Sequence, residues 1–174
     1  MKFLNKRKLV KQSAENLYSF AVSQGRTPWF YAECGVTDDV NGRFEMIAMH
    51  VFLLLQRIKQ SDIADSKLGQ ALFDVMFRDM DQSLREMGAG DLGVGKRVKA
   101  MAKSFYGRVA AYEAALDDPS VLAEVVIKNV YGGDRDYIEN AKDLADYINL
   151  QAAHLKNLSK SDLLSGQMVF KVIV

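Results

Sequence analysis

Residues 73–112 read FDVMFRDMDQSLREMGAGDLGVGKRVKAMAKSFYGRVAAY, and this stretch decides the fold class. Apolar residues recur at helical spacing on both sides of a glycine-rich segment that contains Gly88 and Gly90. This spacing predicts two amphipathic helices joined by a bend. The first helix is rich in acidic residues and the second in basic ones, so an antiparallel pair would be partly self-complementary in charge.

The rest of the chain extends the helical pattern. Strict alternation of apolar and polar residues is nearly absent, and the 174 residues include only 2 prolines. Both features favour an all-α protein. We expect a single domain over residues 1–174, a bundle of about six or seven helices with a short apolar C-terminal tail. The predicted helices cover about 6–24, 44–58, 66–87, 94–116, 119–132 and 136–158.

Polar residues with short side chains predict where several helices begin. Thr37 or Asp38 is suited to cap the helix over 44–58, because such side chains accept hydrogen bonds from free backbone N–H groups. Asp91 is the corresponding candidate after the glycine bend. Asp118 followed by proline should start another helix, since proline is tolerated at the first helical position.

The apolar pattern also predicts which faces are buried. The helix over 44–58 is apolar almost all round, so we place it at the centre of the bundle. The inward stripes of two other helices include Leu9 and Met87. The tail, residues 168–174, reads MVFKVIV and would favour aggregation if left free. We expect it to dock on its own core, to pair with another segment or to be covered by a partner.

Composition and charge exclude several classes of function. The net charge of +1 gives no overall attraction to nucleic acid or anionic lipid. Cys34 is the only cysteine, which excludes an intramolecular disulfide framework, and two histidines give metal ligation little support. The longest apolar run, 46–55, is about half the length of a membrane-spanning helix. The sequence therefore predicts a soluble protein with no catalytic, cofactor-binding or metal site.

The glycine bend matches two phosphate-binding motifs by letter. Residues 88–93 fit the dinucleotide fingerprint, and Gly90, Gly95 and Lys96 fit most of a P-loop, although Arg97 stands where Ser or Thr binds Mg²⁺. Both motifs require a preceding strand, and here an amphipathic helix precedes the glycines. We interpret the segment as a helix–helix bend. The alternative is a small-molecule or nucleotide-binding enzyme that uses residues 88–96.

A basic face follows the bend. Lys96, Lys99 and Lys103 lie at i, i+3 and i+7, so they share one side of the helix opposite its apolar stripe. One interpretation is a solvated face, partly paired with the acids of the preceding helix. The other is a surface for an acidic or phosphate-bearing partner.

His50 interrupts the longest apolar run, and Arg57 follows it seven residues later on nearly the same face. A lone histidine in such a run is most often a core residue with a satisfied hydrogen bond. The eight methionines have two interpretations as well. They are either ordinary core residues or the lining of an adaptable apolar groove of the kind that promiscuous binding proteins use.

Three ordered pieces of the chain carry a family resemblance. They are GRTPWFYAECGVTDDVNGRFEMI (25–47), MHVFLLLQRI (49–58) and the stretch from Phe77 to Tyr112 that includes LREMG. Over about residues 17–116, the chain resembles the ubiquinol–cytochrome c chaperone family, whose members assemble the cytochrome bc1 complex. After Leu116 the resemblance is weak. The chain looks like the α-proteobacterial form of this family.

The resemblance implies a non-catalytic chaperone that binds newly made cytochrome b, the membrane-embedded haem subunit of the complex. It implies a bacterial cytoplasmic location with peripheral contact to the inner membrane, and no binding to DNA. Because mitochondrial relatives work with the ribosome and a small partner protein, both are candidate partners here. The predicted partner-contacting residues are His50, Arg57, Asp79, Arg85, the lysines Lys96, Lys99 and Lys103, and the groove candidates Phe73, Phe77 and Phe105.

Overall fold

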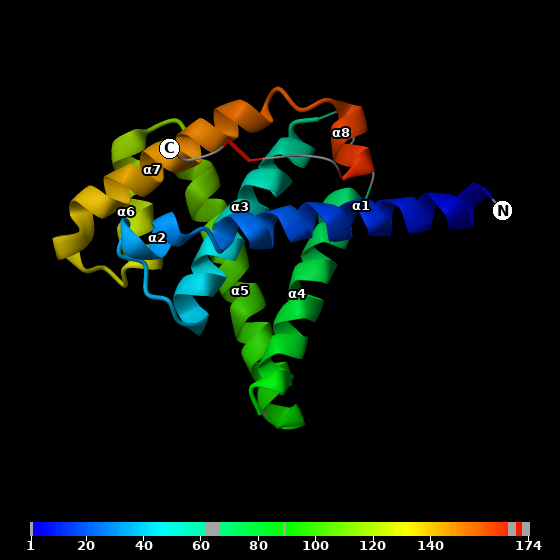
Figure 1. The fold of residues 1–174 in the computed structure, drawn as a ribbon, viewed down its shortest axis with the longest axis horizontal. Helices are drawn as coiled ribbons and strands as arrows, with labels where there is room; N and C mark the ends of the chain where they lie inside the picture. Colours follow the sequence, from blue (N-terminus) through cyan, green and yellow to red (C-terminus); the bar gives the residue numbers. More distant parts are fainter. Residues whose placement is uncertain (1, 62–66, 89, 167–169, 172–174) are drawn as a thin grey trace.

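The computed structural model describes residues 2–61, 67–88, 90–166 and 170–171. All the regular secondary structure in these ranges is helical, which confirms the predicted all-α class. Most helices form a compact body, and two of them, α4 and α5, extend from it as a long hairpin (Figure 1).

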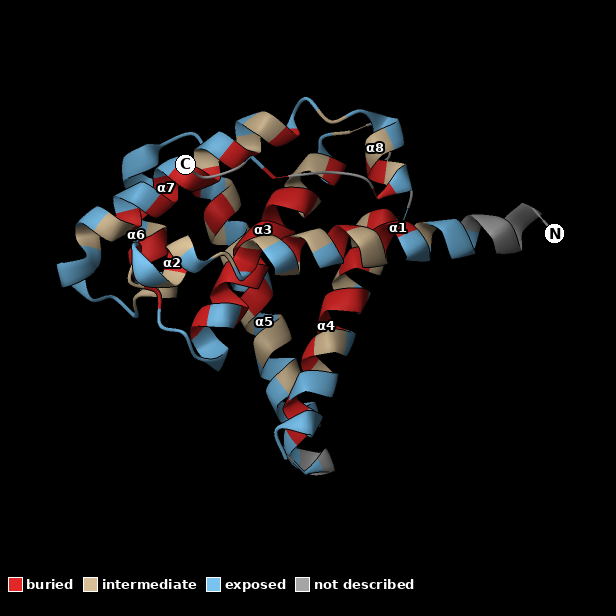
Figure 2. Cartoon of the chain, in the orientation of Figure 1, coloured by how far each residue is buried: buried red, intermediate tan, exposed pale blue. Residues whose placement is uncertain are grey.

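Helix α3, Val40–Lys59, runs through the centre of the body, as predicted. It packs against α1, α4, α5, α6 and α7, and its buried residues lie on every side of the helix (Figure 2). The carboxylate of Asp39 caps it by accepting a hydrogen bond of 2.8 Å from the Gly42 N–H. The predicted caps Thr37 and Asp38 are therefore wrong. Asp39 has an extended backbone directly before the first helical turn, as an N-cap residue does.

Helix α1, Lys2–Gly25, crosses the body and extends beyond it at the N-terminal end (Figure 1). Leu17 and Ala21 are buried as predicted, but Leu9 is 66% exposed, so its predicted inward orientation is wrong. Leu9 faces solvent, whereas its neighbour Val10 packs against the core. The turn after α1 contains a short helix that the sequence did not predict, α2, Pro28–Ala32.

Helices α4, Leu68–Glu86, and α5, Asp91–Ala115, form the antiparallel hairpin that the sequence predicts (Figure 1). The chain leaves α4 through Gly88, whose φ of +85° is readily adopted only by glycine. Each helix buries its apolar stripe against the other or against the body (Figure 2). The tip of the hairpin is mostly exposed.

Two predictions at the hairpin tip are wrong. Asp91 is the first residue of α5, and the residue before it, Gly90, occupies the N-cap position without a side chain to cap the helix. Met87 is 56% exposed, because it follows the last residue of α4 and no longer shares the buried face of that helix.

The C-terminal half begins with α6, Pro119–Val130, which Asp118 caps as predicted by accepting hydrogen bonds from two backbone N–H groups. The helix predicted over 136–158 is instead a short 3-10 turn, η2 (Arg135–Tyr137), followed by α7, Ile138–Leu155. Helix α8, Lys160–Ser165, was not predicted. It packs against α1.

The described part of the tail docks on the protein's own core, which was one of the three predicted arrangements. Phe170 is 3% exposed. The other residues of the tail, 168–169 and 172–174, lie outside the described residues. Over the part of the chain that the structure describes, no helix is long and apolar enough to span a bilayer.

Candidate partner-binding site

The outer side of α5 carries the predicted basic face. Lys96, Lys99 and Lys103 are all exposed, and Arg97 beside them is exposed too. None of the three lysines forms an ion pair or hydrogen bond with a described residue. The face is therefore basic and solvated, without the predicted pairing of these lysines to the acids of α4.

The acids of α4 are engaged elsewhere. Asp79 accepts a hydrogen bond of 2.7 Å from the Tyr18 hydroxyl, which ties α4 to α1. Burial and this bond raise the pKa of Tyr18 well above its usual value, so the phenol remains a donor. Asp81 pairs with Arg85 on the next turn of α4, with 2.6 Å between Oδ2 and Nε. Of the predicted contact residues, Asp79 thus serves the fold, whereas Arg85 is exposed at the hairpin surface.

The three phenylalanines predicted to line a groove hold the hairpin together. Phe77 and Phe105 are buried, with ring centroids 5.9 Å apart, and the Phe73 ring lies 4.5 Å from that of Phe77. Phe73 is only half-buried, and its ring stacks at 5.1 Å on Tyr106. Of these aromatic residues, only Phe73 and Tyr106 are therefore accessible to a partner.

Tyr106 is a candidate contact that the sequence analysis missed. It is 57% exposed and lies three residues after Lys103, so it continues the basic face by one turn. Exposed tyrosine is common at the centre of protein interfaces. The i+3 spacing from Lys103 was the available signal, but the neighbouring Phe105 in the apolar stripe obscured it.

An ion pair anchors the inner half of α5 to the body. Arg108 donates from Nε to Glu45 Oε2 at 2.6 Å, and its Nη2 also donates to the same carboxylate. The guanidinium lies 5.6 Å above the Phe44 ring. Burial raises the pKa of Glu45, and the hydrogen bond from Arg108 opposes that shift. Because both side chains are largely buried, this pair is a structural contact between α5 and α3.

His50 lies deep in the core, with no exposed surface. Its Nδ1 donates to the Met46 carbonyl and its Nε2 accepts from the Tyr147 hydroxyl, both at 2.6 Å. Because a carbonyl can only accept, the proton of the neutral ring lies on Nδ1. Burial lowers the pKa of His50 to about 4. The structure confirms a core histidine with satisfied hydrogen bonds and no exposed surface.

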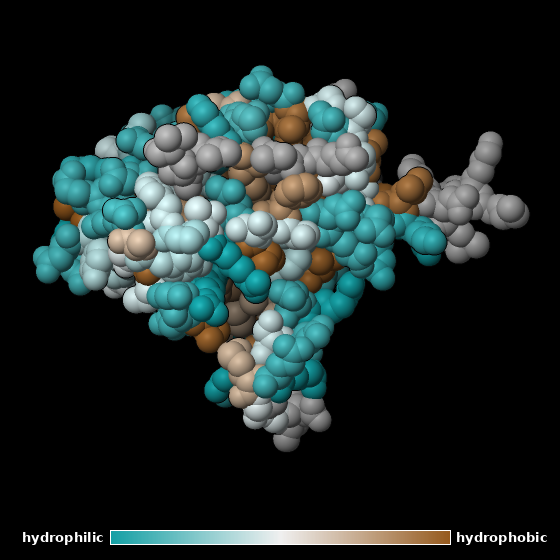
Figure 3. Space-filling model, in the orientation of Figure 1, coloured by the Kyte–Doolittle hydropathy of each residue, from teal (hydrophilic) through white to brown (hydrophobic). Residues whose placement is uncertain are grey.

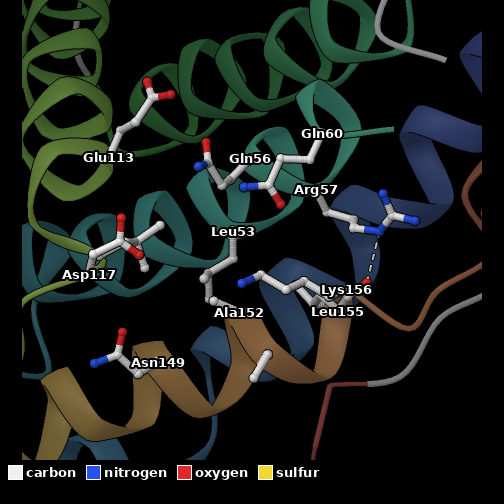
Figure 4. A pocket seen from close by; sticks show the side chains of 12 residues that line it. Leu53, Gln56, Arg57, Gln60, Glu113, Asp117, Asn149, Ala152, Leu155 and Lys156 are labelled. Atoms are coloured by element: carbon white, nitrogen blue, oxygen red, sulfur yellow. Dashed lines mark hydrogen bonds between the residues drawn. The ribbon is translucent and has the colours of Figure 1, made fainter. Parts of the chain in front are cut away.

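Arg57 borders a small cavity between α3, α5 and α7 (Figure 4). Its Nε donates to the Leu155 carbonyl at 2.9 Å, so the side chain binds the C-terminal end of α7. Gln56, Gln60, Glu113 and other polar groups surround the cavity, whose volume is about 150 Å³. Since ligand pockets usually enclose at least ~300 Å³, we assign no ligand to it.

The glycine bend lacks the context of a nucleotide site. Helix α4 precedes it where both phosphate-binding motifs require a strand. The described residues place Gly88 in a left-handed turn and Gly90 at the start of α5. This geometry agrees with the predicted helix–helix bend.

The surface beside the hairpin is partly apolar. Figure 3 shows brown, hydrophobic surface in the hollow between the hairpin and the body beneath α1, whereas polar surface covers much of the rest of this view. An apolar hollow next to a basic helix could accept a partner with both apolar and anionic groups.

Known proteins share both the sequence and the fold. The model of the ubiquinol-cytochrome C chaperone family matches residues 32–170, so this match continues past Leu116. The crystal structure of the Cbp3 homolog from Brucella abortus superposes with a TM-score of 0.85 at 37% sequence identity, and the match covers 98% of this chain and 94% of that chain.

Curated relatives are more distant in sequence. Ubiquinol-cytochrome-c reductase complex assembly factor 1 of Xenopus laevis is 26% identical over 167 residues, which cover 95% of this chain and 84% of that protein. The Homo sapiens protein of the same name is 24% identical, and the match covers 56% of its length. The chain thus spans just over half of this human relative.

Proposed function

The chain belongs to the ubiquinol-cytochrome C chaperone family, and on that premise we propose that it binds newly made cytochrome b, without catalysis, while the ubiquinol–cytochrome c reductase complex is assembled. Relatives in Xenopus and human carry the name of assembly factors of this complex. We place the protein in the bacterial cytoplasm, in peripheral contact with the inner membrane, and treat residues 1–174 as one domain.

The basic face of α5 is the observation that carries this proposal. Lys96, Lys99 and Lys103 are exposed on a hairpin that extends from the body, and no described acid neutralises them (Figure 1). A newly made membrane protein offers charged loops together with apolar segments. The lysines suit the first, and the half-buried Phe73 with the exposed Tyr106 suits the second.

Not all predicted contact residues take part in this proposal. Phe77, Phe105 and Asp79 hold the hairpin together or tie it to the body, and Arg57 binds the end of α7. They position the binding surface instead of touching the client. Ribosomal RNA or a small partner protein could use the same basic face, and the experiment below includes both.

The test is a triple substitution of Lys96, Lys99 and Lys103 to glutamate. The protein is tagged in its source bacterium, membranes are solubilised gently during rapid synthesis of the complex, and captured proteins are identified by mass spectrometry. We expect the unmodified chain to enrich cytochrome b without the mature complex, and the triple variant to lose at least about 90% of that capture, since charged contacts of this kind each contribute ~1 kcal/mol or more.

A matched control separates this surface from net charge. Substituting the exposed Lys128, Lys156 and Lys160 by glutamate changes the net charge by the same amount, from +1 to −5, because each substitution subtracts two charges. The control should keep its capture and both variants their helical circular dichroism. Equal capture by the two variants would contradict the assignment of the site, and ribosomal proteins or another small protein in place of cytochrome b would contradict the proposed client.

A further inference from the structure

The described end of the chain is held through its main chain. Gln151 on α7 has no exposed surface, and both ends of its side-chain amide bind Lys171. Its Nε2 donates to the Lys171 carbonyl and its Oε1 accepts from the Lys171 N–H, both at 2.8 Å. A neighbouring β-strand satisfies an extended residue in the same way. The Lys171 side chain is exposed, so this recognition does not depend on residue type.

An aromatic pocket lies next to this amide. The ring of Phe170 meets that of His50 edge-on, with centroids 4.9 Å apart and planes at 82°. His50 is itself fixed by hydrogen bonds to Met46 and Tyr147, as described above. The site therefore combines a pocket for one aromatic side chain with a hydrogen-bonding pair for the next main-chain unit. Proteins that bind extended peptides divide affinity and specificity in this manner.

A buried glutamine at position 151 indicates a binding site more than ordinary core packing. An apolar side chain there would pack beside Phe170 without a buried amide that needs partners. Gln151 instead requires both main-chain groups of an extended residue, and the amide would lose these bonds if the segment left. The side chain thus selects a chain conformation.

The segment arrives from a fixed anchor. The Ser13 hydroxyl of α1 donates to the Leu164 carbonyl of α8, and Gly166 follows with a φ of +67°. A Cβ at Gly166 would lie 2.9 Å from the Ser13 carbonyl oxygen, so α8 approaches α1 closely here. Only residues 167–169 separate this anchor from Phe170. A tether this short gives the segment an effective concentration of the order of mM at its own site.

We infer that Gln151 and the pocket at His50 form a docking site for an extended apolar segment with an aromatic side chain, and that Phe170–Lys171 occupies it in cis. A newly made apolar segment has the same chemistry: an unpaired main chain and apolar side chains. The statement that such a segment displaces Phe170 rests on the proposed function. The C-terminal segment then acts as a resident competitor that keeps the site closed until client is present.

A peptide supplied in trans tests the site on the full chain. The double variant F170A/K171P removes the aromatic ring and the Lys171 N–H from the resident segment. The probe is a labelled peptide with the sequence of residues 167–174 and a solubilising extension, and binding is read by fluorescence anisotropy. We expect no binding at μM concentration to the unmodified chain, because the tethered segment outcompetes it, and μM binding to the double variant.

Changes in the peptide test the two parts of the site. Alanine in place of its phenylalanine should weaken binding about 100-fold or more, and methylation of the following amide nitrogen about tenfold. The matched control F105A opens a comparable gap in the hairpin and should not bind the peptide. If the double variant fails to fold alone, added peptide should restore its helical circular dichroism.

Several results would overturn the inference. One is a folded double variant that does not bind the peptide. Another is peptide binding that neither peptide change weakens. The third is an unfolded double variant whose helical circular dichroism the peptide does not restore. A dimer of the unmodified chain that exchanges its C-terminal segments would make a second copy the occupant. In the capture experiment, the double variant should retain more cytochrome b than the unmodified chain. If no variant captures it while the peptide still binds, the proposed function fails and the docking site stands.

Discussion

The buried His50 makes the stability of the protein depend on pH in a calculable way. Its pKa is about 4 in the folded state against 6.5 for an ordinary histidine, because burial disfavours the charged ring. The unfolded chain therefore binds a proton at pH values where folded His50 remains neutral. Since the unfolded state holds more protons in this window, the free energy of unfolding must fall as pH falls from about 6.5 to about 4.

The size of the effect follows from the same two values. The full difference of pKa corresponds to about 3 kcal/mol, because each unit is worth ~1.4 kcal/mol. Between pH 7 and pH 5 the linkage relation gives a loss of about 2 kcal/mol from His50 alone. For a protein of this size, that loss would lower the melting temperature by roughly 4–8 °C. Above pH 7 the contribution of His50 is complete and no further change is expected.

Urea denaturation of the unmodified chain and of His50→Gln, at pH 7, 6 and 5, measures this contribution. Glutamine can still hydrogen-bond to Met46 and Tyr147 but does not titrate, so carboxylate effects cancel in the comparison. The unmodified chain should lose about 2 kcal/mol more than the variant between pH 7 and pH 5. The control His154→Gln removes the other histidine and should keep the unmodified behaviour. Equal pH dependence of the unmodified chain and His50→Gln would refute the reasoning.

Three further substitutions probe the packing. Gly42→Ala should lower stability by about 2 kcal/mol or more, since its Cβ would lie 1.9 Å from the Thr37 carbonyl oxygen; an unchanged melting temperature would show that this loop is not fixed. Gly107→Ala has open space around the new Cβ and should raise stability by about 1 kcal/mol, so a lower melting temperature would contradict the exposure of that face. Arg108→Met should cost about 3 kcal/mol at pH 7 by leaving Glu45 buried without its partner. Adding Glu45→Gln should recover part of that loss in urea denaturation, and no recovery would argue against the ion pair.

Local patterns were sufficient to predict the helical class, the hairpin and the central helix. These patterns gave correct predictions where one short segment determines the local structure. Asp118 before proline starts α6 as predicted, and the glycine bend turns the chain at Gly88. They gave wrong predictions where burial or capping depends on residues outside the segment. Leu9 belongs to an apolar pattern but faces solvent, although its neighbour Val10 packs against the core. Asp39 caps α3 in place of the predicted Thr37 or Asp38.

In the candidate site too, local spacing predicted some features, and contacts between distant residues determined the others. The spacing of Lys96, Lys99 and Lys103 predicted a shared exposed face, and the structure has them on it. Whether acids of α4 would reach these lysines depends on how the two helices are rotated about their axes, which spacing does not specify. The docking of Phe170 beside His50 joins residues far apart in the chain. No local pattern could have predicted that contact.

The contacts of α5 change along its length in a way that bears on function. Near the body, Arg108 is paired with the buried Glu45, and Phe105 is packed against α4. Further toward the tip, the basic side chains have no described partner and face solvent. Because folding depends on the inner contacts and not on the outer ones, the outer lysines can be replaced without loss of the core. Substitutions on the two halves of one helix should therefore separate stability from client binding.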